Sequence, residues 1–190
     1  VIPLPIHYET FSFRNNLNPE TDYIISMGGD GTILDTVTFV AEKNIPILGI
    51  NLGRLGFLAG TTQHEIAYAI DALEKGTYVR DERSLLNCTA NFPLFDDAPF
   101  ALNDFTIQRK DSSALVKIHT YVNGEFLCTY WADGVIVSTP TGSTGYSLSC
   151  GGPIIAPQTN SIIITPVAPH NLNIRPIIIP DTSIISFEVE

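Results

Sequence analysis

The strongest constraint on the fold is a short apolar segment, residues 23–27, that stops abruptly at Gly28 and Gly29. An apolar run that glycines end in this way is typical of a buried strand. From Thr32 the apolar residues return at helical spacing until about position 41, and Thr32 is available near the N-cap of that helix. Strand, glycine turn and helix in this order predict the first crossover of a parallel sheet.

The same rhythm continues to about residue 77. A second buried strand is expected at 47–50 and a second helix at about 66–73. Gly76 is placed to end that helix. Residues 1–77 therefore predict an α/β, Rossmann-like N-terminal domain.

After residue 77 the pattern changes to short segments rich in β-branched and aromatic residues. Strands are expected at 85–91, 101–109, 115–122, 125–131, 135–138, 161–165, 176–179 and 183–189. Asn123-Gly124 predicts a tight hairpin, because both turn positions require positive φ. No periodic segment of helix length occurs in this half, so residues 78–190 predict an all-β, sandwich-like domain.

Composition restricts the class of protein. Of the 190 residues 44% are hydrophobic and 16% charged, which excludes a disordered chain. No apolar run approaches the roughly 18 residues of a membrane-spanning helix. The net charge of −10 argues against nucleic acid or a membrane as the partner, since both attract a basic face. Cys88, Cys128 and Cys150 follow no metal-binding spacing and indicate free thiols in a reducing cytoplasm.

The segment Gly28-Gly-Asp-Gly-Thr32 is the first candidate site. It lies where a strand ends and a helix begins, which is where open α/β sheets bind ligands. Glycines there let backbone N–H groups approach phosphate oxygens. Asp30 would repel phosphate, so we expect it to serve as a general base toward a hydroxyl or as a ligand of Mg²⁺. The alternative is a tight turn in which Asp30 only caps the helix.

The second candidate site is the segment 132–149. Six hydroxyl-bearing residues and two glycines lie between Ser138 and Tyr146. Such a loop offers many neutral donors and acceptors to sugar hydroxyls and phosphates. The alternative is a solvated linker, but apolar runs on both sides favour a loop held by rigid strands, where binding sites concentrate.

Three weaker signals each have a more ordinary explanation. Asn103-Asp104 interrupts a strand-like run and is typical of a bulge or turn. Phe57 follows a strand end and could face a ligand, although core packing is usual for phenylalanine. His170 follows Pro169 and precedes Asn171, and a lone histidine in such a context is usually structural.

Taken in order, these motifs resemble those of the NAD kinase family. The matching segments are Gly28–Thr32, Asn51-Leu-Gly-Arg-Leu-Gly-Phe-Leu58, Asn103-Asp104, Asp133–Tyr146, Gly151-Gly-Pro153 and Pro169-His-Asn-Leu-Asn-Ile-Arg-Pro176. The first motif also occurs in diacylglycerol kinases, and phosphofructokinases carry a near version. The segment 133–152 is far more specific to NAD kinases. The resemblance covers most of residues 23–180, and the fold of that family agrees with the two domains expected above.

The resemblance implies transfer of the ATP γ-phosphoryl group to the 2′-hydroxyl of the adenosine ribose of NAD, which yields NADP. Mg²⁺ or another divalent cation would neutralise charge during the transfer. By the same resemblance Asp30 is the general base or orients the hydroxyl. The loop that approaches the ATP phosphates would comprise Gly28, Gly29, Gly31 and Thr32.

The residues that the resemblance assigns to NAD binding are Asp30, Gly31, Phe57, Asn103, Asp104, Asp133, Thr141, Thr144, Gly145, Tyr146, Ser149 and Ala168. Asn103 and Asp104 would hold ribose hydroxyls. Asp133 would contact the nicotinamide end, often across a subunit interface in this family. The positions 141–149 would shape the adenine and ribose pocket.

The chain departs from the family pattern at three positions. Asp104 stands where relatives usually have Glu, Trp131 where a basic residue is frequent, and Gly145 where many relatives have Ala. Each change concerns ligand contacts and none removes a group that the reaction needs. We also expect the first Rossmann-like strand and the last part of the β domain to lie outside the chain.

The resemblance further implies a cytoplasmic homodimer or homotetramer. The metal ligands, the choice between ATP and polyphosphate, and the choice between NAD and NADH stay open. Two other functions are compatible with parts of the sequence. A lipid or sphingoid-base kinase would share the glycine-rich loop, although the hydroxyl-rich loop suits a sugar better. A nucleotide-binding regulator without catalysis would have no need of Asp30.

Overall fold

The computed structural model describes residues 17–40, 43–53, 56–95, 99–110 and 114–190. The chain divides into two compact units, of which the first ends at Arg80 and the second begins at Asp81. The change in sequence pattern at residue 77 lies close to this division. Among the described residues no helix is long and apolar enough to cross a membrane.

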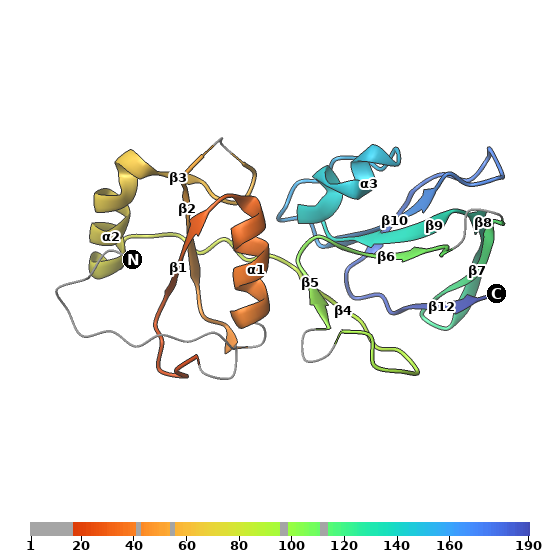
Figure 1. The fold of residues 1–190 in the computed structure, drawn as a ribbon, viewed down its shortest axis with the longest axis horizontal. Helices are drawn as coiled ribbons and strands as arrows, with labels where there is room; N and C mark the ends of the chain where they lie inside the picture. The colour runs from red at the N-terminus through yellow and green to blue at the C-terminus, as the bar shows by residue number, and fades with distance from the viewer. Residues whose placement is uncertain (1–16, 41–42, 54–55, 96–98, 111–113) are drawn as a thin grey trace. The chain divides into compact units, whose positions relative to one another are not determined.

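The described residues of the first unit form a three-stranded parallel sheet with helices on its two sides (Figure 1). Its strands are β1 (Ile24–Gly28), β2 (Ile47–Asn51) and β3 (Thr61–Thr62), in that spatial order. The helices are α1 (Asp30–Val40) and α2 (Ile66–Lys75), the latter preceded by the 3₁₀ turn η3 (Gln63–Glu65). The prediction of a parallel sheet with crossover helices is confirmed.

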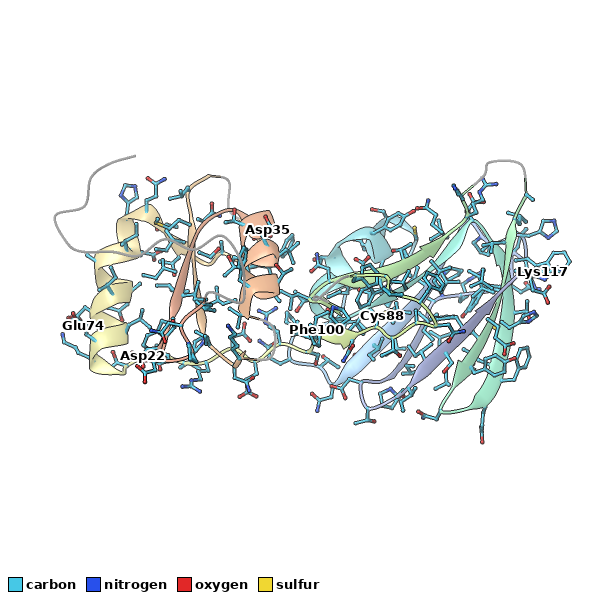
Figure 2. The ribbon with its side chains drawn as sticks, turned by 60° about the horizontal axis from the view of Figure 1, so that its bottom comes forward. Asp22, Asp35, Glu74, Cys88, Phe100 and Lys117 are labelled. Atoms are coloured by element: carbon cyan, nitrogen blue, oxygen red, sulfur yellow. The ribbon has the colours of Figure 1, made fainter. Side chains whose placement is uncertain are left out.

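Helix α2 ends at Gly76 as predicted. Gly76 adopts a φ of 65°, and its N–H donates to carbonyls of the last helical turn. The helices turn acidic side chains such as Asp35 on α1 and Glu74 on α2 toward solvent (Figure 2). Between α1 and the sheet, Ile33 packs closely over Gly49 of β2.

Thr32, which the sequence placed near the N-cap of α1, does not cap the helix. The helix already begins at Asp30, and the carbonyl of Gly29 accepts the N–H groups of Thr32 and Ile33 at 3.1 and 3.3 Å. Accepting the first intrahelical bonds is the role of the cap residue. Thr32 lies inside the first turn, where its side chain packs against Gly28.

The part of the second unit that the structure describes forms three antiparallel sheets. The largest has the order β11 (Ile177–Pro180), β10 (Ser161–Val167), β9 (Gly134–Ser138) and β6 (Asp104–Gln108). A second has the order β12 (Ile185–Val189), β7 (Val116–Val122) and β8 (Glu125–Ala132). The short strands β4 (Leu86–Asn87) and β5 (Phe100–Ala101) pair separately. Figure 2 labels Lys117 on β7 and Phe100 on β5.

The two larger sheets share one core, which makes this unit a sandwich. Ile118 and Tyr130 from one sheet pack with Val135 and Ile164 from the other. Alternation along each strand directs these side chains to one face. The predicted hairpin is also confirmed, because Asn123 and Gly124 have φ values of 53° and 82°.

Several local details differ from the expectation. The strand expected at 85–91 is reduced to the two residues of β4, and β3 was not expected from the sequence. The segment 101–109 forms two strands rather than one, because the chain turns at Leu102-Asn103 so that the Asn103 carbonyl can accept bonds from Ser138 and Thr139. The hydroxyl-rich segment is not a plain loop. It folds into the 3₁₀ turn η4 (Thr141–Thr144) and the one-turn helix α3 (Tyr146–Ser149), which are too short to produce a helical periodicity.

Strands β9 and β10 are buried along their whole length. One face packs into the sandwich core. On the other face Thr165 of β10 shares a hydrogen bond with Ser147 of α3, which covers this side of the sheet (Figure 1). The sheet therefore gives the segment 139–152 a rigid base.

Candidate functional site

The glycine-rich segment lies at the carboxyl ends of β1 and β2. Gly28, the last residue of β1, is paired with Asn51 at the end of β2, and its carbonyl accepts the Leu52 N–H at 3.0 Å. Asp30 follows as the first residue of α1. This is the location at which open α/β sheets bind ligands.

The Asp30 carboxylate accepts three backbone hydrogen bonds from the loop that follows β2. Oδ2 accepts the N–H of Phe57 at 2.8 Å, while Oδ1 accepts those of Leu58 and Ala59 at 3.0 and 3.2 Å. Partial burial raises the pKa of Asp30, but the three N–H donors outweigh this and hold it below the ordinary 3.8. Asp30 is therefore ionised at neutral pH and fastens residues 57–59 to the start of α1.

Counting the bonds from the described residues, one acceptor position of Asp30 remains. An ionised carboxylate offers about four lone-pair sites, and the three N–H groups occupy two on Oδ1 and one on Oδ2. A hydroxyl group can donate to the remaining site on Oδ2. The lowered pKa suits Asp30 to orienting such a hydroxyl and makes it a weak base until the hydroxyl itself becomes acidic.

The glycines of this region divide into two kinds. A Cβ at Gly56 would lie 2.2 Å from Asp30 Oδ1, and one at Gly28 would lie 2.1 Å from the Thr32 hydroxyl oxygen, so both positions are needed for packing. A Cβ at Gly29 or Gly31 would meet no atom of the described residues within 4 Å. These two glycines leave the start of α1 open to a ligand.

The exposure of nearby residues also indicates that the start of α1 is open to a ligand. Gly31 and Thr32 are exposed, and the Phe57 side chain is 79% exposed. An exposed phenylalanine beside a charged loop is not part of a core. The structure thus brings together the predicted residues 28–32 and 57 within the first unit.

In the second unit the predicted residues 103–104 and 141–145 are neighbours. The Asn103 carbonyl accepts the Thr139 N–H at 2.9 Å, and a Cβ at Gly142 would lie 2.2 Å from the same oxygen. Asp104 pairs with the last residue of β9, and its Oδ2 lies 3.9 Å from the Cβ position of Gly145. Burial raises the pKa of Asp104, and the Thr106 hydroxyl offsets this only in part.

The hydroxyl groups of the segment 138–149 fall into two sets. Four are buried and bonded within the protein, for example Ser147 Oγ to Thr165 Oγ1 at 2.8 Å and Ser143 Oγ to the Ile155 N–H at 3.0 Å. These four are Ser138, Thr139, Ser143 and Ser147. The other four are half-buried or exposed, and they are the predicted ligand residues Thr141, Thr144, Tyr146 and Ser149.

The charges of Asp133 and Asp104, the two predicted carboxylates of this unit, both act on Tyr146. Burial raises the pKa of its phenol, and Cys150 and the charges of Asp133 and Asp104 add to the rise. Tyr146 thus lies within electrostatic reach of both aspartates. Its hydroxyl is favoured as a neutral donor or acceptor.

Asp133 lies between β8 and β9, beside the ends of β6 and β10. Its N–H donates to Val167 at the end of β10, and its carboxylate pairs with Arg109 after β6, with 3.0 Å between Oδ1 and Nε. The next residue after Val167 is Ala168, which has a φ of +44°. A non-glycine residue at this φ is strained and often belongs to a functional site.

A pocket of about 330 Å³ lies beside this junction. It is lined by Thr129, Trp131, His170, Asn171 and Ile174. The Trp131 carbonyl accepts the His170 N–H at 2.8 Å, and the Lys117 ammonium lies 5.2 Å from the centre of the Trp131 ring. His170 therefore contributes to a pocket wall, which its sequence context did not indicate.

Sequence reasoning missed three residues that organise these sites. Arg109 pairs with Asp133, and Gly56 makes room for Asp30. Arg83 donates to the Thr141 hydroxyl at 3.2 Å across 58 positions of sequence. Gly56 belongs to the motif 51–58 and could have been found there, whereas the two arginines carry no local signal.

The described residues contain no group of three or more His, Cys, Asp or Glu side chains arranged to hold a metal ion. Asp30 offers one remaining acceptor position, and Asp104 is half-buried. Neither forms a cage for a divalent cation by itself.

Comparison with known sequences identifies both halves of the chain. Residues 3–78 match the ATP-NAD kinase N-terminal domain, and residues 102–190 match the ATP-NAD kinase C-terminal domain. The NAD kinase of Cytophaga hutchinsonii is 52% identical over 100% of this chain and 64% of its own length. That of Bacteroides fragilis is 50% identical over 91% of this chain and 60% of its own length. The chain thus spans less than two thirds of these curated relatives.

Solved structures agree with the sequence matches. A yeast NADH kinase complexed with NADH superposes with a TM-score of 0.79 at 35% identity, over 89% of this chain and 50% of that protein. An NAD kinase from Archaeoglobus fulgidus in complex with ATP gives a TM-score of 0.78 at 27% identity, over 90% of this chain and 66% of that protein. The predicted fold, an α/β domain followed by a β-sandwich domain, is confirmed. Both domain matches, in the order that the motifs predict, show that the chain belongs to the NAD kinase family.

Proposed function

We propose that the protein containing this chain is an ATP-dependent NAD kinase, which transfers the γ-phosphoryl group of ATP to the 2′-hydroxyl of the adenosine ribose of NAD. The observation that carries the proposal is the Asp30 carboxylate, which is kept ionised and has one acceptor position left beside the open start of α1. The names of relatives about half identical to the chain support the same reaction.

Asp30 would receive the hydrogen bond of the 2′-hydroxyl on Oδ2. Phosphoryl transfer asks little covalent chemistry of the protein, so orientation of the nucleophile is a large part of catalysis. The hydroxyl becomes acidic as its bond to phosphorus forms, and a carboxylate with a low pKa can then take the proton.

The ATP phosphates would lie against Gly28, Gly29, Gly31 and Thr32. The open backbone at positions 29 and 31 and the positive end of the α1 dipole both favour phosphate oxygens. The three N–H groups of residues 57–59 offset part of the repulsion between the Asp30 carboxylate and phosphate.

NAD would bind the open polar groups of the second unit. Asn103 and Asp104 would hold ribose hydroxyls, with Asp104 reaching less far than a glutamate. Asp133, fixed by Arg109, would contact the nicotinamide end. The remaining residues that would line the NAD site are Asp30, Gly31, Phe57, Thr141, Thr144, Gly145, Tyr146, Ser149 and Ala168.

Mg²⁺ or a related cation would enter with the nucleotide. The metal ligands stay open, since Mg²⁺ is often held mainly by substrate phosphates and water. Such an ion supplies charge neutralisation at the phosphates. We also propose that the protein is cytoplasmic and forms a homodimer or homotetramer. Light scattering of the whole protein would test the assembly.

The test of the reaction is a coupled assay of the whole protein with NAD, ATP and MgCl₂. An NADP-specific dehydrogenase detects NADP as it forms. We expect NADP formation that requires both ATP and the divalent cation. Binding of NAD in a calorimeter without NADP formation would favour a regulator, and phosphorylation of a lipid alcohol without NAD binding would favour a lipid kinase.

A further inference from the structure

Arg83 lies near the start of the second unit and bonds two partners with one guanidinium group. Its Nη1 donates to Thr141 Oγ1 at 3.2 Å, and its Nε donates to Asp81 Oδ2 at 2.8 Å. Nη2 bonds the same carboxylate oxygen. Asp81 also accepts a bond from Gln158 Nε2 at 3.3 Å, which holds the Asp81 carboxylate in place. The carboxylate in turn fixes the plane of the Arg83 guanidinium group.

The bond from Arg83 determines what the Thr141 hydroxyl can do. A guanidinium group only donates, so Thr141 Oγ1 is the acceptor and the hydroxyl hydrogen must point to a different atom. Among the described residues no acceptor for this hydrogen is found. Thr141 is only half-buried, in the turn η4 that also carries Thr144.

We infer that Arg83 is a positioning residue that holds the Thr141 hydroxyl as a hydrogen-bond donor toward the nucleoside of NAD. The inference rests on the proposed function, in which Thr141 lines the adenine and ribose pocket. The ligand atom that Thr141 meets must be an acceptor, namely a ring nitrogen or a ribose oxygen. Arg83 itself does not touch the ligand and acts through Thr141.

Replacing Asp81, the residue that pairs with Arg83, should have a smaller effect on NAD binding than replacing Arg83 itself. The Arg83 bonds lower the pKa of Asp81 despite the opposing effect of burial, so this partner is a carboxylate at neutral pH. Replacing Asp81 by Asn keeps an acceptor but removes the ion pair. Asp81→Asn should therefore weaken NAD binding less than Arg83→Ala does.

The experiment is a double-mutant cycle in the whole protein with Arg83→Ala, Thr141→Val and both together. Steady-state kinetics give the KM for NAD and kcat, and calorimetry gives the affinity for NAD. We expect each single variant to raise the KM for NAD about tenfold, the loss of one charge-supported hydrogen bond, with kcat changed by less than about twofold. Because Arg83 acts through Thr141, the double variant should resemble Thr141→Val alone.

Lys75→Ala is the matched control. It also removes a cation from an ion pair, with Asp71 on α2, but this pair is exposed and belongs to the first unit. Its kinetic constants should equal those of the unmodified protein. If Arg83→Ala has no thermal melting transition, Arg83→Lys replaces it, since one ammonium group keeps a charge beside Asp81 but lacks the fork that reaches both partners.

Two results would overturn the inference alone: an unchanged KM for NAD in the Arg83 variant, or effects of the two single variants that multiply in the double variant. A whole protein that neither forms NADP nor binds NAD would overturn the proposed function and this inference with it. The activity of the unmodified protein separates the two cases.

Discussion

The backbone N–H of Phe57 donates to Oδ2 of Asp30 at 2.8 Å, although 27 positions of sequence separate the two residues. This bond joins the start of α1 to the loop that follows β2. The same carboxylate oxygen is the one with an acceptor position left for a substrate hydroxyl. The geometry of residues 56–59 and the orientation of Asp30 therefore depend on each other.

Gly56→Ala should disrupt this arrangement. The new Cβ would lie 2.2 Å from Asp30 Oδ1, so either the carboxylate or the loop must move. We expect the variant to lose about 1–3 kcal/mol of unfolding free energy, which is usual for overpacking, together with most of the NADP-forming activity. Urea denaturation and the coupled assay measure the two effects.

Gly60→Ala is the control for that substitution, because a Cβ there meets no atom within 4 Å. Its stability and activity should stay close to those of the unmodified protein. Equal behaviour of the two alanine variants would contradict the close packing of Gly56 against Asp30.

The pH dependence of stability should distinguish the two aspartates. The pKa of Asp30 is lowered in the folded protein, so its stabilising contribution is complete above about pH 4 and is lost as the pH falls through the folded value. Asp30→Asn should make unfolding free energy less dependent on pH in this acidic range. Denaturant titrations between pH 2 and pH 7 measure the change.

Asp104 should behave in the opposite way. Burial raises its pKa, so stability falls as the pH rises from the ordinary value through the folded one. Asp104→Asn removes a buried charge and should raise unfolding free energy at pH 7, with the gain disappearing at low pH. A loss of stability at pH 7 that persists at low pH would show that the carboxylate has partners beyond Thr106.

The two sets of hydroxyls in the segment 138–149 should have different roles: the buried set should contribute to stability and the half-buried or exposed set to NAD binding. Ser147→Ala leaves Thr165 without its buried partner and should cost about 1–3 kcal/mol of unfolding free energy. Ser149→Ala, at an exposed position of the same helical turn, should leave the melting temperature unchanged and weaken NAD binding. Thermal melting and calorimetry of both variants test the division, and reversed effects would refute it.

Features set by neighbouring residues could be predicted from the sequence. The left-handed Gly76 and the Asn123-Gly124 hairpin depend on local backbone preferences, and both formed where expected. β1 and β2 of the first unit were recognisable as short apolar runs, the first ended by Gly28 and Gly29 and the second begun after Pro46, whereas β3 was not predicted. The family resemblance added candidate site residues that periodicity alone cannot assign.

Features that depend on distant contacts could not be predicted. A bulge or turn at Asn103-Asp104 was expected, but the bonds that the Asn103 carbonyl accepts at the end of β9 were not. The bond of Arg83 to Thr141 likewise depends on η4 lying beside it. Asp30 was expected to act on a ligand, but its bonds to residues 57–59 follow from the meeting of β1 and β2 in space. Single-turn helices such as α3 leave too short a pattern to detect.

The most direct test of the account is the turnover number for NADP formation in Asp30→Asn. Asparagine occupies the same volume but cannot serve as proton acceptor, so we expect a fall of at least about 100-fold in kcat while calorimetry still detects NAD binding. Asp35→Asn, on the exposed side of the same helix (Figure 2), is the control and should keep full activity. Near-normal turnover of Asp30→Asn would contradict the assignment of Asp30 to the reacting hydroxyl.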